Sequence, residues 1–269
     1  MRYQIQELGV GGILDQALTL TKNHFGAFVS IIGVTLAPVL LATNLFNLTM
    51  VPQPASFIPT PAEMEAMQAA QAQYLPVIIG LAMATILASI ISNAAILHGV
   101  AAAYLGQPVS TGAAVSRAFG SFLPLLGTSI LVGLCIMGGF ILFVIPGIIF
   151  AFWFMLSTQV VVIEGISGTA AMGRSKFLMK GNAGTIFALL LLLGFLNGMS
   201  GAGIHFIPQP HAKAVISVLI QCLLSVVGSA ALVVFYFSCR CRNEQYDLKL
   251  LAQDLGGEAG VLDDGDAWS

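Results

Sequence analysis

Long uncharged apolar runs constrain this chain more than any other feature. The sequence holds six runs without a Lys, Arg, Asp or Glu in their interior, at roughly 25–50, 76–98, 121–145, 147–163, 183–203 and 214–238. A helix needs about 20 apolar residues to cross the ~30 Å hydrocarbon core of a bilayer. Only 8% of all residues are charged, against roughly 25% in soluble domains, so the chain cannot cover a water-facing surface. The predicted fold is an all-α integral membrane protein with six transmembrane helices.

The six runs and their short connections fill the chain to about residue 255. Residues 1–255 are therefore predicted to form a single polytopic membrane domain, with no room for a separate soluble domain. The remaining residues, 256–269, contain Asp263, Asp264 and Asp266 among several glycines. Such a short, acidic, glycine-containing segment is predicted to be a disordered tail.

The distribution of basic residues predicts the orientation. If the N-terminus is cytoplasmic, the inner segments hold nine of the ten Lys and Arg residues, and the outer loops hold only Lys213. Lys and Arg accumulate on the cytoplasmic side of membrane proteins. The asymmetry predicts an even number of spans with both termini in the cytoplasm.

The fourth run is short. It starts after Pro146 and ends before Glu164, which is barely enough helix to cross a bilayer at about 1.5 Å per residue. The third and fourth runs are predicted to form a tight hairpin with its tip shallow in the outer leaflet. A re-entrant pair that does not cross the membrane is the alternative.

The first outer loop carries a helix start signal. In Thr60-Pro61-Ala62-Glu63, Thr60 suits the N-cap, Pro61 suits the first helical position, and Glu63 completes a capping box. A short external helix is expected before the second span.

Three short cytoplasmic segments resemble one another. They lie at about 12–24, 110–120 and 167–180, and each has a basic residue near its end. Such a segment suits a helix in the membrane interface, with its cations toward anionic headgroups. Each precedes a pair of apolar runs, so the pattern predicts three parallel repeats of an interfacial helix plus a helical hairpin. Chance similarity among small-residue-rich membrane helices is the alternative.

The second half of the chain contains a set of motifs in a fixed order. These are Ile145-Pro146-Gly147-Ile148, Glu164, the stretch from Ala171 to Gly181 with Arg174-Ser175, and a final span leading into Tyr236, Arg240, Arg242, Glu244 and Tyr246-Asp247-Leu248. The arrangement resembles the membrane domain of glycerophosphoryl diester phosphodiesterases and related uncharacterised bacterial inner-membrane proteins. The resemblance covers about residues 105–255 and, loosely, the N-terminal hairpin.

That resemblance implies six spans and a location in the bacterial inner (cytoplasmic) membrane. It does not imply the phosphodiesterase reaction. In that family a separate soluble barrel domain carries out the reaction, and no segment of this chain could form such a domain. The resemblance therefore bears on architecture more than on function.

Charged residues gather at the predicted cytoplasmic ends of the last three spans. Opposite charges there are expected to pair across helix ends or to set the topology, and the excess bases could hold lipid phosphates. The cluster consists of Glu164, Arg174, Lys176, Lys180, Arg240, Arg242, Glu244 and Asp247.

Polar residues inside the runs offer a second candidate site. Asn93, Asn197 and Gln221 could line a polar pathway, although hydrogen bonding between helices is the commoner role of such residues. No run contains an interior acid or base, which argues against a proton-coupled pump.

The sequence offers no pattern for catalysis, metal or cofactor binding. We find no nucleophile–base constellation and no phosphate-binding loop, and His205 and His211 lack further ligands that a metal would need. The net charge of −2 gives no sign of a nucleic-acid partner. No cofactor is expected, and the expected partners are membrane lipids.

The leading hypothesis is a non-enzymatic inner-membrane protein that interacts with lipid or organises a protein partner. The first alternative is a passive or weakly coupled transporter of a small polar solute. An intramembrane enzyme is a third alternative, for which the sequence supplies the fewest candidate residues.

Overall fold

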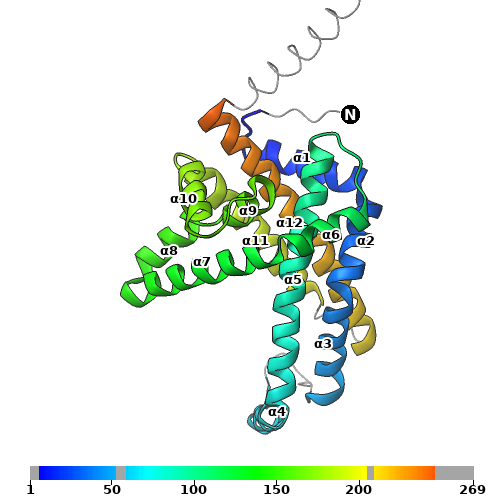
Figure 1. The fold of residues 1–269 in the computed structure, drawn as a ribbon. Coiled ribbons are helices and arrows are strands. Elements are labelled where there is room, and N and C mark those ends of the chain that lie inside the picture. Colours follow the sequence, from blue (N-terminus) through cyan, green and yellow to red (C-terminus); the bar gives the residue numbers. More distant parts are fainter. Residues whose placement is uncertain (1–5, 53–58, 205–208, 246–269) are drawn as a thin grey trace, which may run out of the picture.

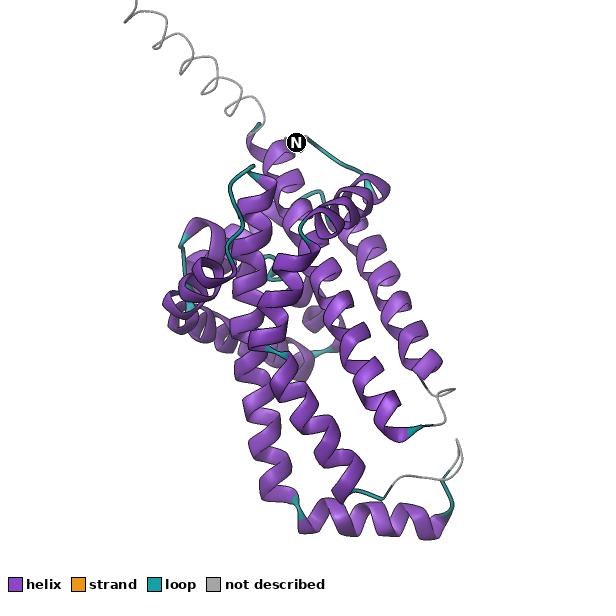
Figure 2. Ribbon diagram, turned by 90° about the vertical axis from the view of Figure 1, so that its right-hand side faces the viewer, coloured by secondary structure: helices purple, strands orange, loops and turns teal. Residues whose placement is uncertain are grey.

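The structure is a computed structural model that describes residues 6–52, 59–204 and 209–245, and all of its regular elements in these ranges are helices. Figure 2 shows the helices and their short connections. They are α1 (Val10–Asn23), α2 (Phe25–Thr35), α3 (Ala37–Met50), α4 (Pro61–Gln73), α5 (Leu75–Tyr104), α6 (Thr111–Gly120), α7 (Phe122–Leu142), α8 (Val144–Trp153), α9 (Ser157–Glu164), α10 (Gly168–Met179), α11 (Ala183–Ile204) and α12 (Pro210–Glu244). The all-α prediction is confirmed.

Within the described residues, five helical segments are long and apolar enough to cross a membrane. They are Leu75–Tyr104, Phe122–Leu142, Val144–Glu164, Ala183–Gly203 and Val215–Glu244. The α2–α3 pair makes a sixth if it is counted as one bent span. The chain is therefore a multi-pass membrane protein, and its apolar surface is the surface that lipid tails would cover.

The first predicted span, 25–50, is not one straight helix. It divides at Leu36 into α2 and α3, which are bent by 54° relative to each other. Pro38 lies at the start of α3. Proline has no N–H to donate to the carbonyl four residues earlier, and its ring clashes with that carbonyl, which explains the bend.

The helix predicted to start after Thr60 is present. It is α4, and its capping box is complete: the Thr60 hydroxyl accepts a hydrogen bond from the Glu63 N–H at 3.3 Å, and the Glu63 carboxylate accepts one from the Thr60 N–H at 2.7 Å. In Figure 2, α4 lies across the lower end of the bundle, far from α1.

The three predicted interfacial segments are α1, α6 and α10, and each has a basic residue in its last turn. Each is followed by an apolar hairpin, so the order of elements repeats three times. α6 packs against α5 and α10 against α9, which precede them in the chain, whereas α1 packs against α12 at the other end of the sequence. The α1–α12 contact brings the first and last units together.

The third and fourth predicted spans form a hairpin with an unexpected direction. Figure 1 shows α7 running across the direction of α5 rather than alongside it. The second arm is broken by a turn at residues 154–156 into α8 and α9. At the tip, Ile141 to Ile145 are between 63% and 80% exposed. A wholly apolar, exposed tip on a crosswise hairpin favours the re-entrant alternative, in which the tip stays in hydrocarbon.

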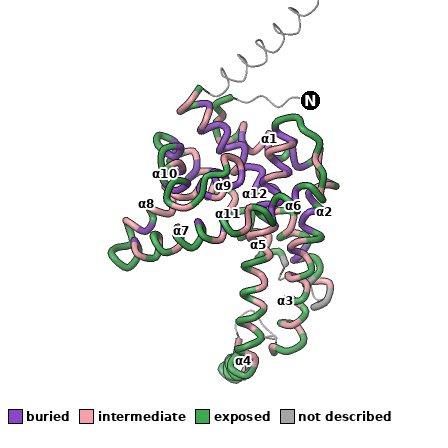
Figure 3. The backbone as a smooth tube through the Cα atoms, in the orientation of Figure 1, coloured by how far each residue is buried: buried purple, intermediate pink, exposed green. Residues whose placement is uncertain are grey.

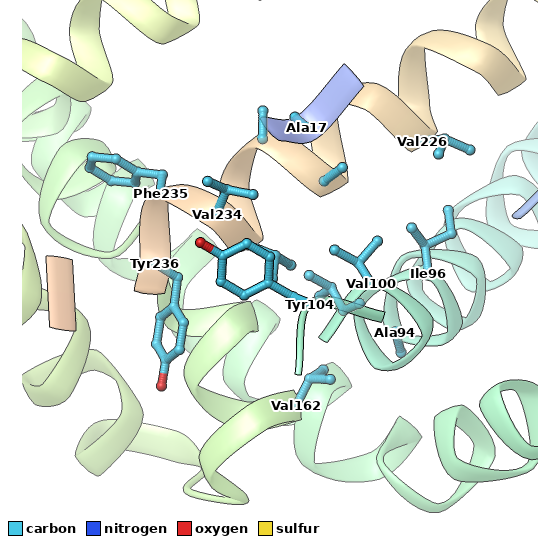
Figure 4. Close-up of a cluster of buried hydrophobic side chains, with 14 of the residues drawn as sticks. Ala17, Ala94, Ile96, Val100, Tyr104, Val162, Val226, Val234, Phe235 and Tyr236 are labelled. Carbon is cyan, nitrogen blue, oxygen red and sulfur yellow. The ribbon is translucent and has the colours of Figure 1, made fainter. Parts of the chain in front are cut away.

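The buried core lies around the C-terminal half of α12. Half of the most apolar stretch of α12 is buried, against 11% for α5 and for α11. Figure 3 places the buried segments where α12 meets α1, α5 and α9. In the close-up of Figure 4, Val234 lies beside Tyr104, with Ala17 and Val100 close by and Phe235 on the far side of α12 from Val100. This core joins all three units at the end of the molecule that carries the charged cluster.

Candidate functional site

An ion-pair network joins three helices at the charged end. Arg174 of α10 donates through Nε to Glu164 Oε2 at 2.9 Å and through Nη2 to Glu164 Oε1 at 3.1 Å. Its Nη1 pairs with the carboxylate of Glu244 on α12. Tyr236, also on α12, donates its hydroxyl proton to Glu164 Oε1 at 2.5 Å. The end of α9 is thereby attached to both α10 and α12.

The network is balanced in charge. Arg240 donates to Glu244 at 3.3 Å, so two carboxylates face two guanidinium groups. The Arg174 side chain is only 22% exposed and that of Glu164 13%. The hydrogen bond to Glu244 raises the pKa of Arg174 above its ordinary value, although burial acts in the opposite direction. A neutral and largely enclosed cluster of this kind holds helices together and leaves little charge for a ligand.

The turn between α8 and α9 is held by α10. The buried Ser175 hydroxyl donates to the Trp153 carbonyl at 2.7 Å and accepts from the Leu156 N–H at 3.1 Å. Backbone groups freed at a helix break must find other partners, above all at membrane depth. The placement of Ser175 therefore fixes α10 against the broken arm of the hairpin.

A second set of contacts fixes the corner between α10 and α11. Arg242 donates to Asn182 Oδ1 at 3.2 Å and lies 3.6 Å from Glu7. Asn182 is buried and donates to the Leu178 carbonyl at 3.0 Å. Gly181 has a φ of +82°, a conformation that glycine adopts without steric strain. Asp247, the last member of the predicted cluster, lies outside the described residues.

Lys176 and Lys180 have a different environment. They line a cavity of about 680 Å³ between α8, α10 and the start of α11, together with Ile149, Phe152 and Trp153. The Lys176 ammonium lies 4.0 Å from the centroid of the Trp153 ring. Across the described ranges, no carboxylate forms an ion pair with either lysine. The two lysines are the members of the cluster that remain available to an anion.

The polar residues of the spans do not assemble as the sequence suggested. Asn93 lines a cavity of about 230 Å³ with Gln159 and Ser229, and the Ser229 hydroxyl donates to Asn93 Oδ1 at 3.3 Å. Asn197 and Gln221 do not line this cavity, and both side chains are exposed on the surface of the helix bundle. The cavity lies between α5, α7, α9 and α12, so that all three units contribute to its lining.

Comparison with known protein families, with curated proteins and with solved structures finds no match to this chain. Within the part of the chain that the structure describes, no three His, Cys, Asp or Glu side chains gather as a metal site would require. His205 lies outside that part. Function must therefore be argued from the charged end, its cavity and the polar cavity.

Proposed function

We propose that this chain is a non-enzymatic, multi-pass protein of the bacterial inner membrane that binds anionic lipid at its cytoplasmic end. The nine-to-one distribution of Lys and Arg supports the orientation. The resemblance to the phosphodiesterase membrane domain supports the choice of membrane. The proposal includes no reaction, because the charged groups at this end either form ion pairs with each other or face an open cavity.

The observation that carries the proposal is the cavity beside Lys176 and Lys180. It offers two ammonium groups next to an apolar and aromatic wall, and it lies on a protein whose apolar surface demands a bilayer. Lysines near the cytoplasmic leaflet attract anionic headgroups by about 1 kcal/mol each. Lys22 and Arg117, in the last turns of α1 and α6, add basic charge to the other two interfacial helices.

Lipid analysis of the purified protein tests this function. Native mass spectrometry after extraction in a mild detergent should show one anionic lipid class retained above its share in the source membrane. Retained lipid with the bulk membrane composition, or none at all, would contradict the proposal.

A second candidate function, passive passage of a small uncharged solute, is favoured by the cavity at Asn93, Gln159 and Ser229. Its lining has no ionisable side chain, so it suits a neutral solute. Proteoliposomes tested for glycerol-driven swelling would distinguish the two functions. Swelling faster than in empty liposomes, abolished by Gln159→Leu, would support passage, and equal rates would exclude it.

A further inference from the structure

We infer that the cavity between α8, α10 and α11 binds the phosphate of an anionic glycerophospholipid, with Lys176 and Lys180 as its two cationic ligands. This inference rests on the proposed function and gives it a defined site. It separates these two lysines from Arg174, which has the same charge on the same helix but does not line the cavity.

The spacing of the two lysines places them together. Lys176 lies in the last turn of α10, and Lys180 is the C-cap residue that directly follows the helix, four positions later. At this spacing both residues lie at the same side of the end of the helix. Both are exposed and both line the same cavity. Two flexible ammonium groups at this separation can contact the oxygens of one phosphate.

The electrostatics of the empty cavity favour an anion. Two like charges at this distance repel each other, and the described residues supply no carboxylate to offset them. The Trp153 ring under the Lys176 ammonium orients that group by a cation–π contact without neutralising it. The N-terminal end of α11 and the C-terminal end of α10 both reach the cavity, and their opposite partial charges leave the two ammonium groups as the main source of the field.

The apolar wall indicates a lipid rather than free phosphate. Ile149, Phe152 and Met179 line the cavity below the lysines. The exposed Phe177 also lines the cavity, and the exposed Phe187 extends the apolar surface along α11. A volume of about 680 Å³ is in the range of sites that take an organic ligand, and is far larger than a phosphate ion requires. The chains of a phospholipid would run along this wall into the bilayer.

The same geometry predicts headgroup selectivity. A zwitterionic headgroup would bring its own ammonium toward Lys176 and Lys180, and like charges repel. A headgroup with a net negative charge has no such penalty. The site should therefore prefer anionic lipids to zwitterionic ones with the same acyl chains.

Lipid titration into the full-length protein in detergent, followed by native mass spectrometry, tests the site. The Lys176→Gln/Lys180→Gln variant should bind a dioleoyl phosphatidylglycerol probe about 30-fold more weakly than the wild type, as two contacts of about 1 kcal/mol each imply. Lys213→Gln removes one lysine charge at a position that does not line the cavity, and its affinity for the probe should stay within about twofold of the wild type. Trp153→Leu, which changes no charge, should weaken binding about threefold.

The outcomes separate the site from the function. If the wild type prefers the anionic probe but the Lys176→Gln/Lys180→Gln variant binds it equally well, the site is refuted and lipid binding stands. If the wild type shows no preference over dioleoyl phosphatidylcholine, the proposed function fails as well. Displacement of the probe by millimolar inorganic phosphate would show that free phosphate is the ligand and would overturn the lipid assignment. An unchanged melting temperature in lipid-free detergent checks that the variants are folded.

Discussion

Arg174 and the pair Lys176–Lys180 have the same charge on the same short helix, yet they lie in opposite environments. Arg174 is largely enclosed and pairs with two carboxylates from two other helices. The lysines are exposed beside an aromatic wall, and no described carboxylate pairs with them. The difference indicates that basic residues on one segment can have separate roles: Arg174 stabilises the packing of three helices, and the two lysines are the proposed ligands of an anion.

The largest effect should come from removing Arg174. Arg174→Gln leaves Glu164 and Glu244 enclosed without their main cation, which should cost about 3 kcal/mol of stability. Thermal unfolding in detergent, followed by circular dichroism, measures it. Lys176→Gln is the matched control and should cost less than about 0.5 kcal/mol. Equal losses in the two variants would remove the distinction between these residues.

A smaller loss is expected when the turn between α8 and α9 loses its partner. Ser175→Ala leaves the Leu156 N–H and the Trp153 carbonyl without the hydroxyl that they share, which should cost about 2 kcal/mol. The same thermal measurement applies. Ser167→Ala is the control, because the Ser167 side chain makes no capping hydrogen bond at the start of α10. An unchanged melting temperature for Ser175→Ala would show that the hydroxyl does not support the break.

The hydroxyl of Tyr236 should contribute less again. Tyr236→Phe keeps the buried ring but removes the hydrogen bond to Glu164, at a cost of about 1 kcal/mol. Tyr74→Phe, at a ring that packs against Phe46 near the opposite end of the bundle, should be neutral. A larger loss of stability in Tyr74→Phe than in Tyr236→Phe would show that the hydrogen bond from Tyr236 to Glu164 does not stabilise the fold.

The position of the tip of the crosswise hairpin can be tested by cysteine labelling, and the expected result is no reaction. A cysteine at Phe143, on the exposed apolar tip, should not react with a membrane-impermeant maleimide from either side of intact vesicles, because hydrocarbon excludes the charged reagent. Lys213→Cys should react from the outer side. Labelling of the Phe143 cysteine from the outer side would show that the hairpin crosses the membrane.

Much of the fold could be predicted from the sequence, since each feature has a strong local cause. The apolar runs reflect the cost of placing charge in lipid, and the start of α4 follows from the capping chemistry of Thr60 and Glu63. The helices α1, α6 and α10 form at the three segments that combine small residues with a basic residue near the end. The bend at Leu36 also has a local cause in Pro38, although the apolar run at 25–50 continues through it.

The arrangement of the site could not be predicted in the same way. In a span that is apolar all round, periodicity does not show which face meets lipid and which meets protein. The sequence therefore grouped Asn93 with Asn197 and Gln221, whereas packing places it with Gln159 and Ser229. Similarly, the carboxylates that pair with Arg174 depend on how α9 and α12 approach α10, which is tertiary information.

One measurement tests the central claim most directly: the melting temperature of three proteins in detergent, with and without added anionic phospholipid. The wild type should gain stability on lipid addition, by about 2.7 kcal/mol at a lipid concentration 100 times the dissociation constant. Arg174→Gln should start lower and still gain, whereas Lys176→Gln/Lys180→Gln should start near the wild type and gain much less. A full gain in the double lysine variant would contradict the division of roles on α10 and the lipid site built on it.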